Sequence, residues 1–198
     1  MILLVAATQR ELCGHDGLVC GVGPVEAAAA TARALALHDI SAVLHVGLAG
    51  ARGLEPGALV VATESVYHDL SAEWPVADRA KPDDLLVALA RAALPGAAAL
   101  PIHTSAGVGA CSSLEHVPLV EAMEGFGVLR AATLAGVPAI ELRAISNAIG
   151  EPDRTRWDVA AGLAALERAL PLLVEALASS GDTRRVADRA SRPPFPTP

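Results

Sequence analysis

Short, continuous apolar runs recur along this chain and alternate with segments that repeat apolar residues at helical spacing. A strand covered on both faces reads as such an unbroken run, whereas a half-exposed strand alternates. Strands that alternate with helices predict an α/β fold, here a three-layer α/β/α sandwich around a central mixed, largely parallel sheet. The expected strands are residues 2–7, 18–21, 42–46, 58–63, 100–105, 117–123 and 139–146. The expected helices are residues 24–38, 82–93, 124–134 and 159–178.

Length and composition fit one domain with a closely packed core. The chain has 198 residues, of which 53% are hydrophobic and only 3% aromatic. This length is at the upper end of the usual size of one domain. We therefore expect a single domain over residues 1–180, followed by a mobile tail rich in Arg and Pro over residues 181–198.

Charge, cysteine content and the N-terminus narrow the class of protein. The formal net charge of −7 argues against binding to nucleic acid. Three cysteines without CxxC spacing imply neither a disulfide framework nor a zinc site, and they fit a reducing compartment. The first apolar run is too short for a membrane span and lacks the basic flank of a signal peptide. We expect a cytoplasmic protein that needs no metal, membrane or nucleic acid.

Polar and small residues follow the ends of several expected strands. In open α/β sheets, ligands bind beyond the carboxyl ends of the strands. We therefore expect these segments to share one rim of the sheet and to form a ligand site there. The segments are residues 8–11, 47–50, 106–113, 123–124 and 146–147.

Two charged residues stand where burial is expected. Glu124 follows an apolar run, where an acid is costly unless it is hydrogen-bonded. Two vicinal sugar hydroxyls would supply the donors, but a helix N-terminus would also favour an acid at this position. Arg143 lies inside an apolar strand, on the same face as Glu141 at i, i+2 spacing. It either pairs with that acid structurally or holds a group in a site.

Other motifs carry weaker signals. Residues 47–50, Gly-Leu-Ala-Gly, are either a tight turn after a strand or a place where backbone amides approach an anion. Residues 21–26 lack the third glycine of a dinucleotide fingerprint, and we favour a plain strand-to-helix turn. His45 is interpreted as a core histidine, Asn147 is either a turn residue or a site residue, and Cys111 has no evident base partner.

Taken together, these pieces resemble the nucleoside phosphorylase and nucleosidase superfamily, which contains methylthioadenosine/S-adenosylhomocysteine nucleosidase. The resemblance runs from Met1 to about Leu177 and rests on LLVAATQREL, GVGPVEAAAA, VGLAGA, PGALVVATESVYHD, VEAMEG and LRAISNAIG. Met-Glu-Gly, followed about twenty residues later by Arg-x-x-Ser-Asn, is specific in combination. The resemblance implies a nucleoside phosphorylase-like fold.

The resemblance also implies roles for individual residues. Glu11 would activate a hydrolytic water, and Arg143 would help to hold that water. Glu124 would bind the ribose hydroxyls, Met123 would pack against the sugar, and Gly50 would lie beside the water. A further position, Val108 in the loop of residues 106–113, would contact the substrate.

Two positions depart from the family pattern. Leu48 replaces the serine of a Gly-Ser-Ala-Gly turn. Ser146 and Asn147 stand where the family has Ser-Asp, whose aspartate protonates the purine at N7. A neutral amide can donate to N7 or to a 6-oxo group, which suits hypoxanthine rather than adenine. A site built for one pattern rejects the other, because a mismatch buries an unpaired polar group.

This asparagine, the following GEPDRTRWD and the short chain most resemble one branch of the superfamily. That branch hydrolyses, in menaquinone biosynthesis, an inosine-type nucleoside with a carboxyphenyl-oxopropyl group on the ribose 5′ side. Candidates for the pocket of that group are Tyr67, His68, Trp74, Phe126 and Trp157. The resemblance implies a reaction without cofactor and a homo-oligomer, a dimer or higher, with the loop of residues 66–81 crossing the interface.

Three alternatives remain open from the residues. An adenine-type nucleosidase is the first. A purine nucleoside phosphorylase is the second, since Arg10 and Arg52 lie near the glycine segment and could bind phosphate, although Glu11 would repel the anion. A non-catalytic module that binds purine nucleosides is the third, and it would not require Glu11.

Overall fold

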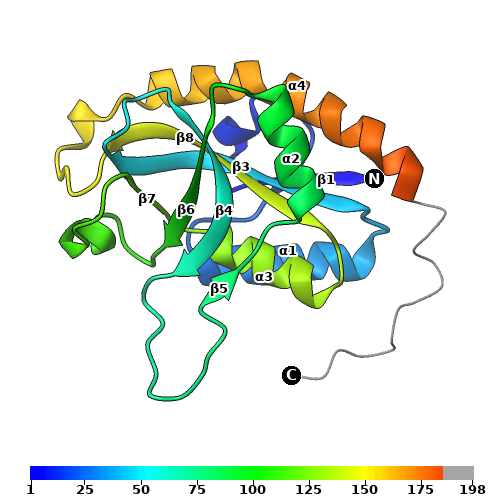
Figure 1. Ribbon diagram of the computed structural model, residues 1–198, viewed down its shortest axis with the longest axis horizontal. Helices are drawn as coiled ribbons and strands as arrows, with labels where there is room; N and C mark the ends of the chain where they lie inside the picture. Colours follow the sequence, from blue (N-terminus) through cyan, green and yellow to red (C-terminus); the bar gives the residue numbers. More distant parts are fainter. Residues whose placement is uncertain (185–198) are drawn as a thin grey trace.

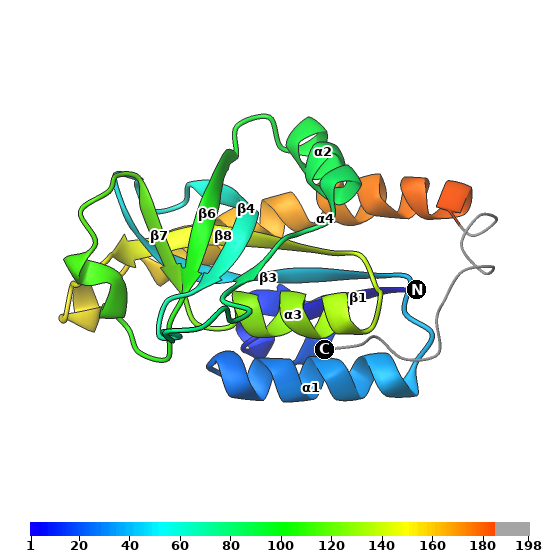
Figure 2. The ribbon, with the colours of Figure 1, turned by 60° about the horizontal axis from the view of Figure 1, so that its bottom comes forward.

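The computed structural model describes the backbone of residues 1–184 and the side chains of residues 1–179. A mixed sheet lies between two pairs of helices, with α2 and α4 above it and α1 and α3 below it in Figures 1 and 2. The helices are α1 (Pro24–Leu37), α2 (Asp84–Ala93), α3 (Gly125–Leu134) and α4 (Val159–Arg184). The 3-10 helices are η1 (Gln9–Leu12), η2 (Ala110–Ser113) and η3 (Arg154–Arg156). The three-layer α/β/α class is confirmed.

Eight strands form the sheet in the order β2-β1-β3-β7-β6-β4-β5, and β8 pairs with both β3 and β4. These pairings close β3, β8, β4, β6 and β7 into a ring of five strands. The pairs β3–β7, β4–β5 and β4–β8 are antiparallel and the others are parallel, so the sheet is mixed. The strands are β1 (Ile2–Ala6), β2 (Leu18–Val19), β3 (Ala42–Arg52), β4 (Leu59–Tyr67), β5 (Arg79–Ala80), β6 (Ala98–Thr104), β7 (Leu119–Ala122) and β8 (Ala139–Ala148).

The apolar core is divided among three clusters, one for each space that the layers enclose. Small and β-branched side chains from all five ring strands fill the ring, including Ala49, Ala62, Ile102, Val120 and Ile145. A second cluster lies between the sheet and α2 and α4, and a third between the sheet and α1 and α3. Along the ring strands, one set of residues therefore faces this inner core, while others, such as Val46, Val61 and Leu142, pack outward against α2 and α4.

One expectation about the strands is wrong. Residues 47–50 were expected to break the strand after Val46, but β3 continues through them to Arg52. The strand shifts its register against β8 between Ala49 and Gly50, which indicates a bulge rather than a turn. Strands β3 and β8 thus run side by side for their whole length and carry the site residues on one scaffold.

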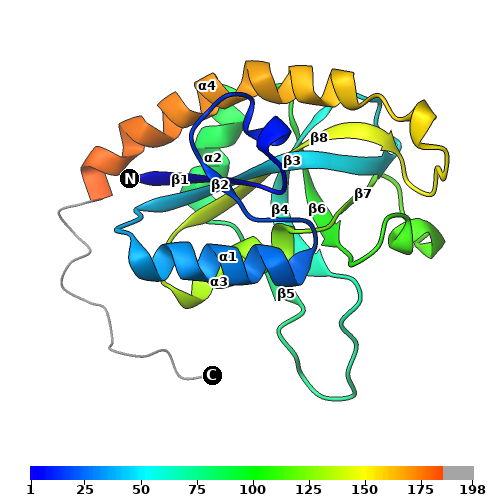
Figure 3. The same ribbon diagram turned by 180° about the vertical axis from the view of Figure 1, so that it is seen from behind.

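Segment ends otherwise follow the local sequence signals. Pro24 stands at the first turn of α1, where its missing N–H costs no hydrogen bond. Asp83 caps α2 by accepting hydrogen bonds from the N–H groups of Leu85 and Leu86. The segment between β4 and β5 projects from the body of the molecule (Figures 1 and 3).

The last helix extends beyond the expected domain boundary. Helix α4 contains Pro171 and continues to Arg184, so residues 181–184 are helical. The rest of the expected mobile tail, residues 185–198, lies outside the described residues. Within residues 1–184, no helix combines the length and the apolarity that a membrane span requires.

Candidate active site

The side-chain amide of Asn147 lies at the carboxyl end of β8, against Gly50 of β3. The two residues are register partners directly after the bulge. A methyl group on Gly50 would come within 2.9 Å of Asn147 Nδ2, so glycine leaves the room that the amide occupies. Asn147 is only 7% exposed, and a ligand at this position would meet a largely desolvated amide.

The orientation of this amide is set by its neighbours along the strand. Ser146 Oγ donates a hydrogen bond to Asn147 Oδ1 at 2.8 Å, and Asn147 Nδ2 donates to the carbonyl of Ala148 at 3.0 Å. The nitrogen carries two hydrogens, so one of them remains for an acceptor on a ligand. The amide is therefore arranged as a hydrogen-bond donor.

Glu11 is a buried carboxylate in η1, directly after the first strand. Its Oε2 accepts hydrogen bonds from Thr8 N at 2.9 Å and Thr8 Oγ1 at 2.7 Å, and its Oε1 accepts one from Leu48 N at 2.9 Å. A carboxylate accepts about four hydrogen bonds. One position, on Oε1, therefore remains for a further donor such as water.

Leu48 stands where the family has a serine, and its side chain lies against α4. A Cβ on Gly162 of α4 would lie 2.6 Å from Leu48 Cδ2, so the leucine side chain packs closely against this helix. The main-chain N–H of Leu48 turns to Glu11 instead. In this segment, the backbone amide of Leu48 thus binds a carboxylate of the protein itself.

Arg143 is fully buried in β8 and is held by several groups. Its Nε lies 2.8 Å from Glu141 Oε1, and its Nη2 lies 3.3 Å from Glu124 Oε2. Burial alone would lower the pKa of Arg143, but the carboxylates of Glu141 and Glu124 outweigh burial and raise it. Arg143 therefore pairs with Glu141 within its own strand and, at the same time, with Glu124 before α3.

Gly47 gives the guanidinium access to Glu11. A Cβ on Gly47 would lie 2.2 Å from Arg143 Nη1 and 2.9 Å from Glu11 Oε1. Both charged atoms thus lie beside the same point of β3. Any side chain on residue 47 would separate or displace them.

His45 and Ser65 complete the buried network. Burial, reinforced by Arg143, lowers the pKa of His45 well below its ordinary value, so the ring is neutral at pH 7. His45 Nδ1 lies 3.1 Å from the carbonyl of Val5, and its Nε2 faces Arg143 Nη2. The histidine therefore donates through Nδ1 and accepts through Nε2, as a core histidine should. Ser65 Oγ donates to Glu141 Oε2.

Glu124 lies at the first position before α3 but does not cap that helix. Its side chain makes no capping hydrogen bond there. Instead, Oε1 accepts from Gly23 N at 3.2 Å, and Oε2 pairs with Arg143. Burial raises the pKa of Glu124, while Arg143 and the Gly23 N–H partly offset that effect. This arrangement favours a site acid over a helix-terminal acid.

Another buried carboxylate, that of Glu121 in β7, anchors the loop that carries Val108. Glu121 accepts hydrogen bonds from Ser105 Oγ at 3.0 Å, Gly109 N at 2.9 Å and Cys111 N at 3.1 Å. It is the register partner of Gly50, in the same row as Asn147. The sequence analysis missed Glu121, although an acid inside an apolar run is the signal that drew attention to Glu124.

Met123 and Val108, the remaining expected site residues, lie outside the network of buried charges. Met123 is half-buried between β7 and Glu124. Val108 is 51% exposed, and the next residue, Gly109, lies close to Gly150 beyond the end of β8. The structure thus gathers Glu11, Arg143 and Glu124 into one network.

The candidates for a 5′ pocket do not converge on one place. Tyr67 and Phe126 stack with ring centroids 5.0 Å apart. Trp157 Nε1 donates to the carbonyl of Glu151, and Trp74 is 70% exposed in the loop between β4 and β5. A cavity of about 360 Å³, lined by residues that include Leu59, Leu94 and Leu172, contains no expected site residue.

The surroundings of Cys111 disfavour a nucleophilic thiolate. Burial, together with Glu121, raises the pKa of Cys111 to about 12, so the thiol keeps its proton at neutral pH.

Comparison with known protein families shows the class of this protein. A family model described as the phosphorylase superfamily matches residues 17–179, which is most of the chain. The chain is thus a member of that superfamily of α/β proteins.

Curated relatives narrow the assignment. The chain is 40% identical over 191 residues to a futalosine hydrolase of Streptomyces coelicolor, covering 84% of this chain and 81% of the relative. It is 35% identical over 205 residues to a futalosine hydrolase of Acidothermus cellulolyticus, covering 92% and 84%. A futalosine hydrolase of Thermus thermophilus is 32% identical over 197 residues, covering 87% and 85%. Within the superfamily, the chain belongs to the futalosine hydrolase family.

Solved structures show the same fold at low identity. A futalosine hydrolase mutant of Helicobacter pylori superposes with a TM-score of 0.76 at 20% identity, covering 88% of this chain and 98% of that chain. The S-adenosylhomocysteine nucleosidase of Streptococcus pyogenes, in complex with 5-methylthiotubericidin, gives 0.75 at 23% identity, covering 90% and 96%.

Proposed function

We propose that this protein hydrolyses the N-ribosidic bond of futalosine, releasing hypoxanthine and dehypoxanthinyl futalosine, as a step of menaquinone biosynthesis. Family membership supports the reaction. The observation that carries the choice of base is the Asn147 amide, which is buried against Gly50 and oriented as a donor.

The reaction passes through a ribosyl cation, so both the leaving base and the sugar need electrostatic help. The purine becomes negative as the bond breaks, and the free hydrogen on Asn147 Nδ2 stabilises it at N7 or at the 6-oxo group. A donor aimed at developing charge is worth about 2.7–4 kcal/mol in a transition state. Asn147 is the only neutral group among the proposed catalytic residues, and its role is to donate.

Glu11 acts on water from the opposite face of the sugar. Its carboxylate is fixed by Thr8 and Leu48, and the remaining acceptor position on Oε1 takes a proton from water. Arg143, whose Nη1 lies beside the same point near Gly47, keeps Glu11 oriented and helps to hold the water. General-base catalysis of this kind contributes about 10²–10⁴-fold.

Glu124 binds the ribose hydroxyls and adds negative field. Three acids, Glu11, Glu124 and Glu141, surround one buried cation, Arg143, while His45 is neutral. The carboxyl groups thus outnumber the cation in this network. This excess of acids favours a cationic sugar over the neutral substrate, which is the differential binding that catalysis requires.

The arrangement of arginines supports hydrolysis over phosphorolysis. Arg52 donates to the carbonyl oxygens of Ser112 and Leu114, and so its guanidinium holds the C-terminal end of η2. Arg10 is exposed, and Glu11 beside it would repel phosphate.

We further propose that the active unit is a homo-oligomer, a dimer or higher, in the cytoplasm. Trp74 is 70% exposed on a segment that projects from the body, which supports a contact between copies (Figure 1). All three cysteines are free, which supports a reducing compartment. Light scattering at several protein concentrations, with Trp74→Ala compared with wild type, tests the oligomer: a wild-type monomer would exclude it.

Base release is the decisive experiment for the reaction. Futalosine, inosine, aminodeoxyfutalosine and methylthioadenosine are incubated with the protein, with and without phosphate, and the bases are separated by chromatography. Phosphate-independent hypoxanthine from futalosine is expected. Adenine release would refute the role of Asn147, phosphate dependence would indicate a phosphorylase, and no release would indicate a binding module.

A further inference from the structure

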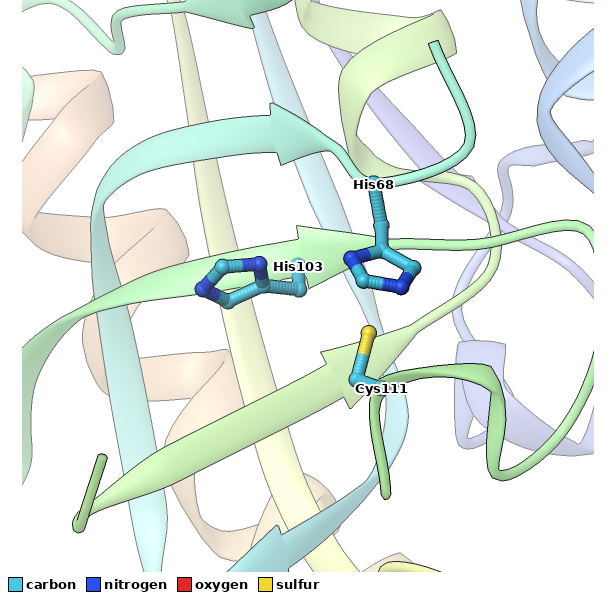
Figure 4. Close-up of side chains that lie close together, drawn as sticks. All are labelled: His68, His103 and Cys111. Atoms are coloured by element: carbon cyan, nitrogen blue, oxygen red, sulfur yellow. The ribbon is translucent and has the colours of Figure 1, made fainter. Parts of the chain in front are cut away.

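Three potential metal ligands meet outside the residues assigned to the reaction. His68 follows β4, His103 lies on β6 and Cys111 lies in η2. One ligand atom from each lies within 4.8 Å of the other two. Figure 4 shows the sulfur of Cys111 pointing toward the ring of His68, and the side chain of His103 lies beside this pair with its ring extending to the left. A third imidazole, that of His116, has its centroid 5.3 Å from that of His103.

His103 carries an unexplained polar atom. Its Nδ1 is buried and has no hydrogen-bond partner among the described residues. A buried polar atom without a partner costs free energy, and such atoms are rare in native proteins. A ligand for that nitrogen would remove the cost.

The charges around the cluster favour a cation. Glu121 and Asp69 act on Cys111, and Glu64, Arg79, His68 and His116 act on His103. The only full positive charge of that set, Arg79, is paired with Glu64 at 2.8 Å. Glu121 and Asp69 therefore leave an excess of negative charge beside two imidazoles and a thiol.

We propose that His68, His103 and Cys111 bind a divalent transition-metal ion of the Zn²⁺ class. Two imidazoles and one thiolate form a donor set typical of Zn²⁺, with three protein ligands and a fourth position taken by His116 or water. On binding, the sulfur–hydrogen bond of Cys111 breaks, the proton passes to solvent, and the thiolate becomes the ligand. No electron transfer is involved.

Such an ion would tie together three segments near the substrate site. It would link the start of the projecting loop after β4, the strand β6, and the loop that holds Val108. Glu121, which lies beside Cys111, already fixes the last of these and is the register partner of Gly50. The ion would thus hold the loop in place and would take no part in the hydrolysis.

Sequence spacing gave no sign of this site. His68, His103 and Cys111 are separated by 35 and 8 positions, as their numbering shows, and no short metal motif has that pattern. Only the pairing of β4 with β6 and the return of the chain through η2 bring them together.

Metal binding to the full-length protein tests the proposal directly. Chelator-treated protein is titrated with Co²⁺, whose visible and near-ultraviolet bands report ligand geometry and thiolate coordination, and then with Zn²⁺ to displace it. One Co²⁺ per chain with a thiolate charge-transfer band is expected. The midpoint temperature of thermal unfolding should rise by roughly 5–10 °C when the Zn²⁺ concentration is about 100 times the Kd, whereas Mg²⁺ should cause no rise.

Matched variants identify the ligands. Cys111→Ser should abolish the charge-transfer band, and His103→Ala should weaken binding by at least about 10–100-fold, which is the loss that even an outer-shell change causes. Cys20→Ser and His38→Ala, which change the same residue types elsewhere, should bind Co²⁺ like the wild type. Wild-type protein without the band or the thermal shift would overturn the proposal, whatever the variants do. An unchanged band in folded Cys111→Ser would overturn it equally.

Discussion

Arg143 Nη2 lies 3.3 Å from Glu124 Oε2, while Nε of the same guanidinium lies 2.8 Å from Glu141 Oε1. One buried cation therefore joins an acid before α3 to an acid within β8. Because unpaired buried charges are strongly unfavourable, each of the three groups fixes the position of the others. The acid proposed to bind the ribose is thus held by the arginine proposed to hold the water, and the two belong to one network.

Replacing Asn147 should separate its electrostatic role from its structural one. Asn147→Ala should lower kcat on futalosine by about 10²–10³-fold, since it removes one donor from the leaving base. Asn147→Asp should shift preference toward 6-amino nucleosides. Steady-state kinetics on futalosine and aminodeoxyfutalosine measure both effects. Near wild-type turnover in folded Asn147→Ala would contradict the assignment.

Glu11→Gln should keep the shape of the site but remove the base. A fall in kcat of about 10²–10⁴-fold with little change in KM is expected, because Glu11 acts on water rather than on the substrate. Glu55→Gln changes an exposed acid and serves as the control, with kinetics like the wild type. If Glu11→Gln raised KM and left kcat unchanged, Glu11 would be a binding residue instead.

Gly47→Ala should disturb the contact region between Glu11 and Arg143. The added Cβ would lie 2.2 Å from Arg143 Nη1, so either the strand or the guanidinium has to move. We expect a loss of about 1–3 kcal/mol in the free energy of unfolding, measured in urea, and a lower kcat. Gly96→Ala meets nothing within 4 Å and should stay within about 0.5 kcal/mol of the wild type. Equal effects in both variants would refute this explanation.

The raised pKa of Glu124 should appear in opposite ways in activity and stability. Ribose binding needs the ionised acid, so activity should fall as the pH drops through this raised pKa, above the range of an exposed glutamate. The native state binds this proton more tightly than the unfolded state does. The contribution of Glu124 to stability is therefore full below the ordinary glutamate pKa, and it is lost as the pH rises through the raised pKa of Glu124.

Two quantities, kcat/KM and the free energy of unfolding, are each measured as a function of pH for the wild type and for Glu124→Gln. The acid limb of the kcat/KM profile should move to lower pH in the variant, and the fall in unfolding free energy over the same window should flatten. An acid limb that stays in place would assign it to another group.

Local patterns predicted most elements because each depends on a few neighbouring residues. The buried runs at β1 and β8 and the proline at the start of α1 were sufficient to place those elements. The glycines at 47 and 50 misled, since glycine indicates a turn as readily as a close approach of side chains. Here both lack a Cβ because Arg143 and Asn147 occupy that space.

The sequence by itself determined the class of fold, because short buried runs alternate with segments of helical spacing along the chain. Through its family resemblance, it also predicted the acids and the amide that we propose carry the chemistry. Only the tertiary structure decided which charges pair, that five strands close into a ring, and that His68, His103 and Cys111 meet. The physical reason is that pairing between distant strands, and the burial it produces, depends on packing across the whole sheet, and no local stretch of the chain encodes it.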